Sequence, residues 1–182
     1  TVPGAVAGWK AAYDFSVKEL GGKLPLSRLL YDAEQTAYDG IAVTNTLKNN
    51  LKSKLKQLID IPGFKDIYLK NGKIPELGDK LLFPAMSKTF SNLIKNGFDD
   101  FYSGEISRDI TSDLARLGSP LTEEDFVDFK STFVKPLELK VKGAKLFNIP
   151  PPTQGIASLM ILGVLDHLNN VYDSDFSFIH NI

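Results

Sequence analysis

The chain has 182 residues, of which 43% are hydrophobic and 24% charged, with a formal net charge of −1. This length suits one domain or one large piece of a bigger protein, and the balanced charge gives no reason to expect a nucleic-acid partner. The absence of cysteine excludes disulfides and thiolate metal sites, no apolar run is long enough to span a bilayer, and the compartment, cytoplasmic or periplasmic/extracellular, stays unknown.

Apolar side chains at helical spacing predict a series of helices in the first part of the chain. Gly21 and Gly22 stop the first helix, Pro25 suits the first turn of the second, and Gly40 ends it. The third contains "LKNNLKSKLKQL", whose lysines are interpreted as the solvated face of an amphipathic helix rather than a phosphate-binding patch. The predicted ranges are 6–20, 25–40 and 44–59.

A turn-rich stretch follows these helices. Residues 61–79 contain "IPGF" and "KNGKIPELGD" and are predicted to form an exposed excursion. Pro84 then suits the first turn of a further helix that ends at Gly97. The side chains of this helix predicted to face inward are Met86, Phe90, Leu93 and Ile94.

Two more helices are predicted before the pattern changes. The first ends near Gly118 and carries an apolar stripe of Ile106, Ile110 and Leu114. The second opens in "LTEEDFVDF", where Thr122 is followed three residues later by Asp125. This spacing is a near-version of the capping box, with aspartate in place of glutamate or glutamine.

From Pro136 onward the pattern becomes that of strands. In "PLELKVKG" apolar and charged residues alternate, and "KLFNI" follows after a turn, so a strand pair is expected near 136–149. A helix apolar nearly all round is predicted over 154–170 and is expected to be buried on both sides. Because two strands rarely make a self-sufficient sheet, these strands are expected to join a sheet supplied from elsewhere.

Three prolines separate the strand pair from the last helix. Pro150–Pro152 cannot donate ladder hydrogen bonds, so they are predicted to end the strand at Ile149 and to hold an extended segment. Thr153 is predicted to cap the helix, with Gln154 as a less favourable alternative. Gly155 is predicted to allow close backbone approach. The residues alone leave two interpretations open, a supporting element of a site or a plain strand-to-helix connection.

The chemically capable side chains each have a structural explanation. Thr1 has the groups of an N-terminal nucleophile, but Val2-Pro3-Gly4 leads into a helix, whereas such a nucleophile heads a strand. His167, on the apolar face of the last helix, is interpreted as a core or helix-end residue.

The remaining charged candidates are interpreted in the same way. Asp99 and Asp100 are taken as surface turn residues, and Arg108 and Asp109 as residues on a helix face. We therefore assign no catalytic and no metal-binding residue, expect no cofactor, and leave the substrate-binding residues unknown.

Six motifs occur in a defined order, and together they resemble a known family. They are "VPGAVAGW", "LGGKLPLSRLLYDAEQTAYDGIAV", "FYSGEISRDI", "LTEEDFVDF", "KPLELKVKG" and "PPPTQG". This order and spacing resemble the large subunit of the γ-glutamyltranspeptidase family. The resemblance covers residues 2–43 and 83–165, and the lysine-rich segment between them matches poorly.

The resemblance implies a fold class and an assembly. The fold would be α/β and mostly helical, the large-subunit part of the αββα sandwich of N-terminal-nucleophile hydrolases. The chain would be a single domain piece, with a helical part over 1–130 and the strand pair and buried helix over 131–172. It would be incomplete and inactive without a small subunit from the same precursor, in a heterodimer or heterotetramer.

The resemblance also implies a reaction. An N-terminal threonine of the small subunit would attack a γ-glutamyl amide of the glutathione type and transfer the acyl group to water or an amino acid, without a cofactor. That threonine, the oxyanion glycines and the arginine that holds the substrate carboxylate would lie outside this chain, the arginine before the Val-Pro-Gly motif. No catalytic residue is carried over.

Two departures from the family pattern keep the substrate open. Thr153-Gln154-Gly155-Ile156 stands where the family usually has two serines and two glycines, and Val141-Lys142-Gly143 where Tyr-Arg-Gly is common. An acylase-like amidohydrolase with another amide substrate is therefore one alternative. A non-catalytic helical binding or structural module is the other.

Overall fold

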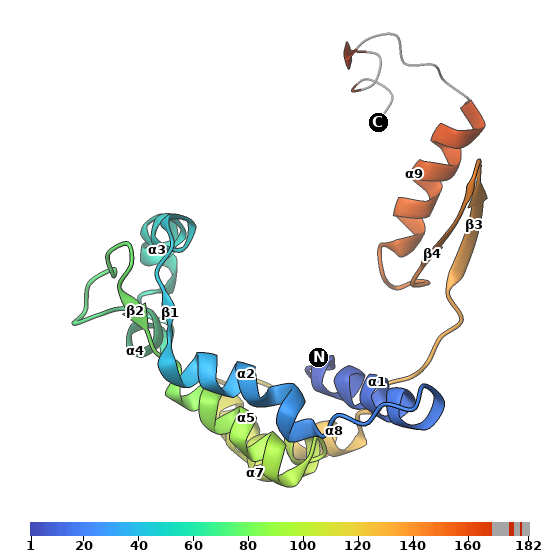
Figure 1. Cartoon of the computed structure of the whole chain (residues 1–182). Coiled ribbons are helices and arrows are strands. Elements are labelled where there is room, and N and C mark those ends of the chain that lie inside the picture. Colours follow the sequence, from blue (N-terminus) through green and yellow to red (C-terminus); the bar gives the residue numbers. More distant parts are fainter. Residues whose placement is uncertain (169–174, 177–178, 180–182) are drawn as a thin grey trace. The chain divides into compact units, whose positions relative to one another are not determined.

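A computed structural model of the chain describes residues 1–168, 175–176 and 179. The chain divides into two compact units, Thr1–Ser131 and Thr132–Ile182, called here the first and second units (Figure 1). The expected single domain piece over 1–182 stays a prediction.

Helices make up most of the first unit, and several of them begin or end at prolines and glycines of the sequence. Pro25 precedes α2, Pro84 is the first residue of α5, and the backbone N–H groups of Gly40 and Gly97 close these two helices. Outside residues 41–83 the helices of this unit are α1 (Ala5–Glu19), α2 (Leu26–Asp39), α5 (Pro84–Asn96), α6 (Asp100–Ser103), α7 (Glu105–Arg116) and α8 (Glu123–Asp128).

The core of the first unit joins helices that are far apart in the sequence. Its buried members are Val6, Ala7, Leu93, Phe98, Tyr102, Ile106 and Phe126. Leu93 faces inward as predicted, but the prediction for Met86 was wrong, because its side chain is 52% exposed. Met86 lies in the first turn of α5, before the helix reaches the core.

The capping box predicted at α8 is confirmed. The Thr122 N–H donates to Asp125 Oδ2 at 2.8 Å, and the Asp125 N–H donates to Thr122 Oγ1 at 3.3 Å. The bond from the Thr122 backbone, together with that from its side chain, lowers the pKa of the Asp125 carboxyl. The box fixes the first turn of α8 and so delivers Phe126, which has no exposed surface, to the core.

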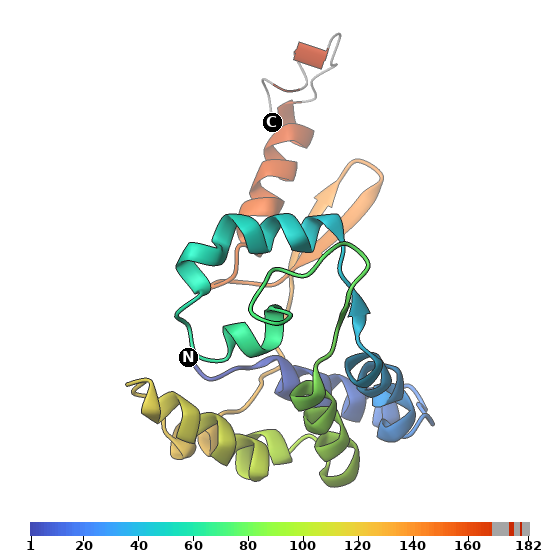
Figure 2. The same ribbon diagram turned by 90° about the vertical axis from the view of Figure 1, so that its left-hand side faces the viewer.

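Residues 41–83 form an extension of the first unit that we call the α3–α4 lobe. It contains β1 (Ile41–Ala42), α3 (Asn45–Leu58), α4 (Phe64–Tyr68) and β2 (Lys80–Leu81). The strands pair antiparallel, and the lobe lies beyond the ends of α2 and α5 (Figures 1 and 2). The expectation of an exposed excursion over 61–79 was therefore incomplete, because this stretch contains α4 and buries Phe64 and Pro75.

The second unit contains the predicted strand pair followed by a helix. Strands β3 (Leu137–Val141) and β4 (Ala144–Asn148) form an antiparallel hairpin, closed by the pair Val141 and Ala144. The helix α9 (Gly155–Leu168) packs against both strands. The last two residues of the predicted helix, 169 and 170, lie outside the described residues.

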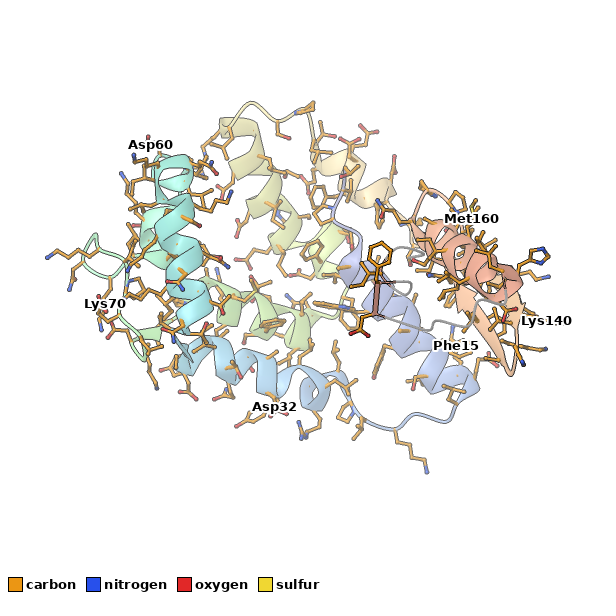
Figure 3. All side chains as sticks on the ribbon, turned by 90° about the horizontal axis from the view of Figure 1, so that it is seen from above. Phe15, Asp32, Asp60, Lys70, Lys140 and Met160 are labelled. Carbon is orange, nitrogen blue, oxygen red and sulfur yellow. The ribbon has the colours of Figure 1, made fainter. Side chains whose placement is uncertain are left out.

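The expected burial of α9 on both sides is not found within this unit. Gly155 and Leu159 are buried, but Met160 and Val164 are 62% and 56% exposed. Met160 is labelled on α9 in Figure 3. A two-stranded hairpin covers one face of a helix, so the remaining apolar side chains of α9 have no covering layer among the described residues of the second unit. Among the described residues, no helix is both long and apolar enough to cross a membrane.

We predict that the isolated 182-residue chain binds the dye ANS strongly, because the outer face of α9 presents apolar side chains to water. Met160→Gln and Val164→Gln should each lower the fluorescence of bound dye without lowering the melting temperature. Leu159→Gln is the matched control, since Leu159 is 8% exposed and its replacement should lower the melting temperature. Negligible dye binding by a cooperatively melting wild-type chain would contradict this prediction.

Candidate functional site

The hydroxyl of Tyr102 joins two of the sequence motifs. It donates a hydrogen bond to the Pro3 carbonyl at 2.8 Å and accepts one from the Ala7 N–H at 2.9 Å. Tyr102 belongs to "FYSG" in α6, and the other two residues belong to "VPGAVAGW" at the start of α1. The motifs are therefore in contact although more than ninety residues separate them.

This contact supplies a helix cap that α1 lacks. The first residue before α1 is Gly4, which has no side chain to accept from the free N–H groups of the first turn, and this turn contains no acidic residue. Ala7 is the third residue of α1, whose N–H an N-cap side chain ordinarily satisfies. The phenol oxygen of Tyr102 takes that role from a different helix.

Aromatic rings hold the Tyr102 side chain in place. Its ring stacks on Phe129 at a centroid distance of 5.6 Å and lies 6.5 Å from Phe126. A Cβ atom added to Gly4 would come within 3.0 Å of the Phe129 ring, so glycine allows the Val-Pro-Gly segment to approach these rings. Burial raises the pKa of the Tyr102 phenol, and the hydrogen bond from Ala7 opposes that rise. The hydroxyl is therefore neutral and able to donate at physiological pH.

Asp100 has a different position from the one predicted. Its Oδ1 atom accepts a hydrogen bond from the Glu105 N–H at 3.2 Å, at the start of α7, and its Oδ2 atom is buried without a partner among the described residues. A Cβ on Gly104 would lie 1.9 Å from Asp100 Oδ1 and 2.7 Å from Asp100 Cα. Asp99 is an exposed turn residue as expected, but Asp100 is a capping residue that requires the glycine of "FYSG".

The triple proline forms a turn, so the predicted extended segment was wrong. The Thr153 N–H donates to the Pro150 carbonyl at 3.3 Å, and the Pro151–Pro152 peptide is cis. The Thr153 hydroxyl then accepts from the Gly155 N–H at 3.3 Å, which supports its predicted capping role. The Gln154 carbonyl accepts from the Ala157 N–H at 3.1 Å, so Gln154 begins the helix through its backbone.

Gly155 is the most restricted position of this turn. A Cβ atom there would lie 2.2 Å from the Ile149 carbonyl oxygen and 2.7 Å from the Asn148 side-chain oxygen. These distances are far below van der Waals contact, so the close approach predicted for Gly155 is confirmed. The turn thereby brings the end of β4 against the first residue of α9.

The other sequence candidates do not converge on one place. Thr1 is exposed ahead of α1, and Arg108 and Asp109 are exposed on α7. His167 is exposed in the last turn of α9, so its interpretation as a core residue was wrong and its helix-end position is correct.

The described part of the chain offers packing elements and no assembled reactive centre. It contains no group of three or more His, Cys, Asp or Glu side chains placed to hold a metal ion. One open hollow lies at the end of α3 between Ile59 and Asp66, and none of the sequence candidates lines it. The roles of Tyr102 and Asp100 were missed by sequence reasoning, although the "FYSG" motif marked their position.

Similarity to known proteins extends over nearly the whole chain. The sequence matches the Gamma-glutamyltranspeptidase family over residues 1–181. It is 37% identical to the oxamate amidohydrolase proenzyme of Klebsiella pneumoniae over 182 residues, which are 100% of this chain and 34% of that protein. It is 29% identical to the glutathione hydrolase proenzyme of Escherichia coli, over 92% of this chain and 28% of that protein. The chain thus spans about a third of the length of these relatives.

A solved structure supports the same conclusion for the fold. The γ-glutamyltranspeptidase of Pseudomonas nitroreducens complexed with L-DON matches with a TM-score of 0.82 and 26% identity. The match covers 98% of this chain and 52% of that one. The predicted fold class, a mostly helical part of an N-terminal-nucleophile hydrolase, is confirmed.

Replacing Tyr102 by phenylalanine should lower the free energy of unfolding by about 1–3 kcal/mol, because the Pro3 carbonyl and the Ala7 N–H lose their partner. Tyr13→Phe is the matched control, since the Tyr13 ring packs on Phe98 and its hydroxyl forms no hydrogen bond with any described residue. Denaturant titration measures both variants. Equal effects of the two substitutions would contradict the assigned role.

The difference between wild type and Tyr102→Phe should also depend on pH. Folding raises the pKa of the Tyr102 phenol. The stability contributed by the neutral hydroxyl is therefore fully present below the ordinary pKa of about 10 and is lost as pH rises through the raised pKa. The two unfolding free energies should therefore converge in alkaline solution.

Gly155→Ala should destabilise the second unit by about 1–3 kcal/mol, since the added methyl group overlaps the Ile149 carbonyl. Gly163→Ala in the same helix is the control, because its Cβ would meet the Leu139 side chain at 3.4 Å and alanine favours a helix. Circular dichroism during thermal unfolding measures both. A Gly155→Ala variant as stable as Gly163→Ala would refute the close approach.

Proposed function

Because the chain belongs to the γ-glutamyltranspeptidase family, we propose that it is the helical part of the large subunit of an amidohydrolase of that family. In this proposal the chain builds a supporting layer and the reactive residues lie elsewhere in the protein. The observation that carries the proposal is the family match over residues 1–181.

The proposed reaction is the cleavage of a γ-glutamyl amide. A threonine at the N-terminus of the small subunit attacks the amide carbonyl, its own α-amino group takes the proton, and backbone N–H groups stabilise the oxyanion. Water or an amino acid then releases the acyl group. Hydrolysis and transfer differ in which of these two nucleophiles enters.

The uncovered face of α9 supports a two-subunit protein. The helix packs on β3 and β4 with one side and presents exposed Ile156, Met160 and Val164 along the other. A sheet of the small subunit, laid against the hairpin and this helix, would bury these side chains in the αββα arrangement. The relatives from K. pneumoniae and E. coli are both proenzymes, which supports formation of the two subunits by processing of one precursor.

Within this proposal the Tyr102 contact positions the substrate end of the large subunit. The family resemblance places the arginine that holds the substrate carboxylate before the Val-Pro-Gly segment. Tyr102 fixes the Pro3 carbonyl and the first turn of α1, and so it fixes the point at which that preceding segment enters the helical core. Tyr102 acts here as a positioning residue.

A second candidate substrate is a small amide such as oxamate. The chain is 37% identical to an oxamate amidohydrolase proenzyme and 29% identical to a glutathione hydrolase proenzyme. The departures at Val141-Lys142-Gly143 and Thr153-Gln154 also favour a substrate other than a γ-glutamyl amide. An acylase-like amidohydrolase of the same family covers this candidate.

The assay that tests the proposal uses the full-length precursor. Release of p-nitroaniline from γ-glutamyl-p-nitroanilide, faster in the presence of an acceptor dipeptide, is expected of a transpeptidase. Ammonia release from oxamate without cleavage of the anilide is expected of the second candidate. Activity on neither compound would count against both.

Intact mass and N-terminal sequencing of the same preparation separate an enzyme from a non-catalytic helical module. The enzyme should contain two polypeptides, one of which begins with threonine. A single uncleaved polypeptide that is stable and inactive would favour the binding or structural module.

A further inference from the structure

The sequence contains two Asn-Gly pairs in different surroundings, Asn71-Gly72 and Asn96-Gly97. An asparagine followed by glycine is open to attack on its side-chain amide by the next backbone nitrogen, because glycine has no side chain to obstruct the approach. The attack needs a glycine N–H that is free of hydrogen bonds, and it needs the peptide plane between the two residues to turn toward the asparagine side chain. The two pairs differ in both respects.

Asn71 and Gly72 form the tip of a tight exposed turn in the α3–α4 lobe. Both have positive φ, 52° and 73°, as in a type I′ turn. The turn is closed by two hydrogen bonds between Lys70 and Lys73, at 2.9 and 3.0 Å, and the Gly72 N–H donates none to any described residue. Lys70 lies on the loop at the outer edge of the lobe (Figure 3).

Asn96 and Gly97 instead end a helix. Asn96 is the last residue of α5, and the Gly97 N–H donates to the Leu93 carbonyl at 2.9 Å. Leu93 is 1% exposed and belongs to the core of the first unit. Rotation about the Asn96–Gly97 peptide therefore breaks a helix-closing bond next to a core side chain.

We propose that Asn71 is a site of spontaneous deamidation and that Asn96 is protected by the end of α5. The Gly72 nitrogen forms a bond to Asn71 Cγ and loses its proton, and the side-chain nitrogen leaves as ammonia. Water then opens the resulting succinimide at one of its two carbonyls and gives aspartate or isoaspartate. The net reaction consumes one water and releases one ammonia, and it needs no enzyme or oxidant.

The modification changes the charge of a basic region. Residues 41–83 contain eight lysines and four acidic residues, and a new carboxylate at residue 71 lies between Lys70 and Lys73. Lys70 forms an ion pair with Asp79 at 2.8 Å, and the new charge competes for that lysine. Isoaspartate also lengthens the backbone of the turn and disturbs the two bonds between Lys70 and Lys73.

The test is to incubate the full-length protein in mildly alkaline buffer and to follow both asparagines by peptide mass spectrometry. Aspartate and isoaspartate should accumulate at Asn71 roughly tenfold faster than at Asn96, which corresponds to about 1.4 kcal/mol of additional opening free energy at the helix end. In denaturant the two rates should become similar, because both are Asn-Gly pairs. Asn71→Gln should abolish the slowly appearing acidic species on ion exchange, and Asn96→Gln should leave it.

Two results would overturn the proposal. One is deamidation of Asn96 in the folded protein as fast as that of Asn71. The other is no modification of Asn71 in the folded protein under conditions in which the denatured protein reacts.

Discussion

The phenol of Tyr102 is the contact on which the first unit depends, because it completes α1 from outside. A helix that begins after glycine has no local cap, and the N–H of its third residue needs an acceptor. The Tyr102 hydroxyl accepts a hydrogen bond from the Ala7 N–H and donates one to the Pro3 carbonyl. Both backbone groups are thereby satisfied in a region lined by Phe126 and Phe129, where an unpaired polar group would be costly.

Three of the motifs that resemble the γ-glutamyltranspeptidase family share a physical role in this chain, which is to let other groups approach the backbone closely. Because glycine has no side chain, Gly4 leaves room for the Phe129 ring, Gly104 for the Asp100 carboxylate, and Gly155 for the Ile149 carbonyl. None of these glycines touches a reactive side chain among the described residues. At these three glycines the similarity to the family therefore reflects how the described elements pack.

Sequence reasoning located the elements that have strong local signals. Pro84, Gly40 and Gly97 mark helix ends through backbone geometry, and the alternation in "PLELKVKG" marks β3, so these elements were predicted correctly. The strands β1 and β2 have two residues each, too few for any periodicity, and they exist because α2 and α5 bring their ends together.

The errors arose where tertiary contacts decide. The prolines at 150–152 were expected to be extended, but the Thr153 N–H bonds back to Pro150 and makes a turn. Asp100 resembled a surface residue in the sequence because its partner, the Glu105 N–H, becomes available only where α7 begins directly after α6. The predicted strand pair and last helix were correct, and the cover expected for that helix stays a prediction.

The contacts within the second unit explain why the proposal includes a covering layer for α9. Polar contacts lie at both ends of the helix. At its start the Thr153 hydroxyl donates to the carbonyl of Ile149, the residue after β4, at 3.0 Å. Near its end Asp166 Oδ1 accepts from the Lys142 N–H, in the hairpin turn, at 3.1 Å. The inner face of α9 adds Leu159 and the contact of Gly163 with Leu139. These interactions hold the helix without any help from Met160 or Val164, and polar side chains at those two positions would serve the unit equally well. Apolar side chains there gain free energy only when another layer removes them from water, which is the contribution that the proposed small subunit makes.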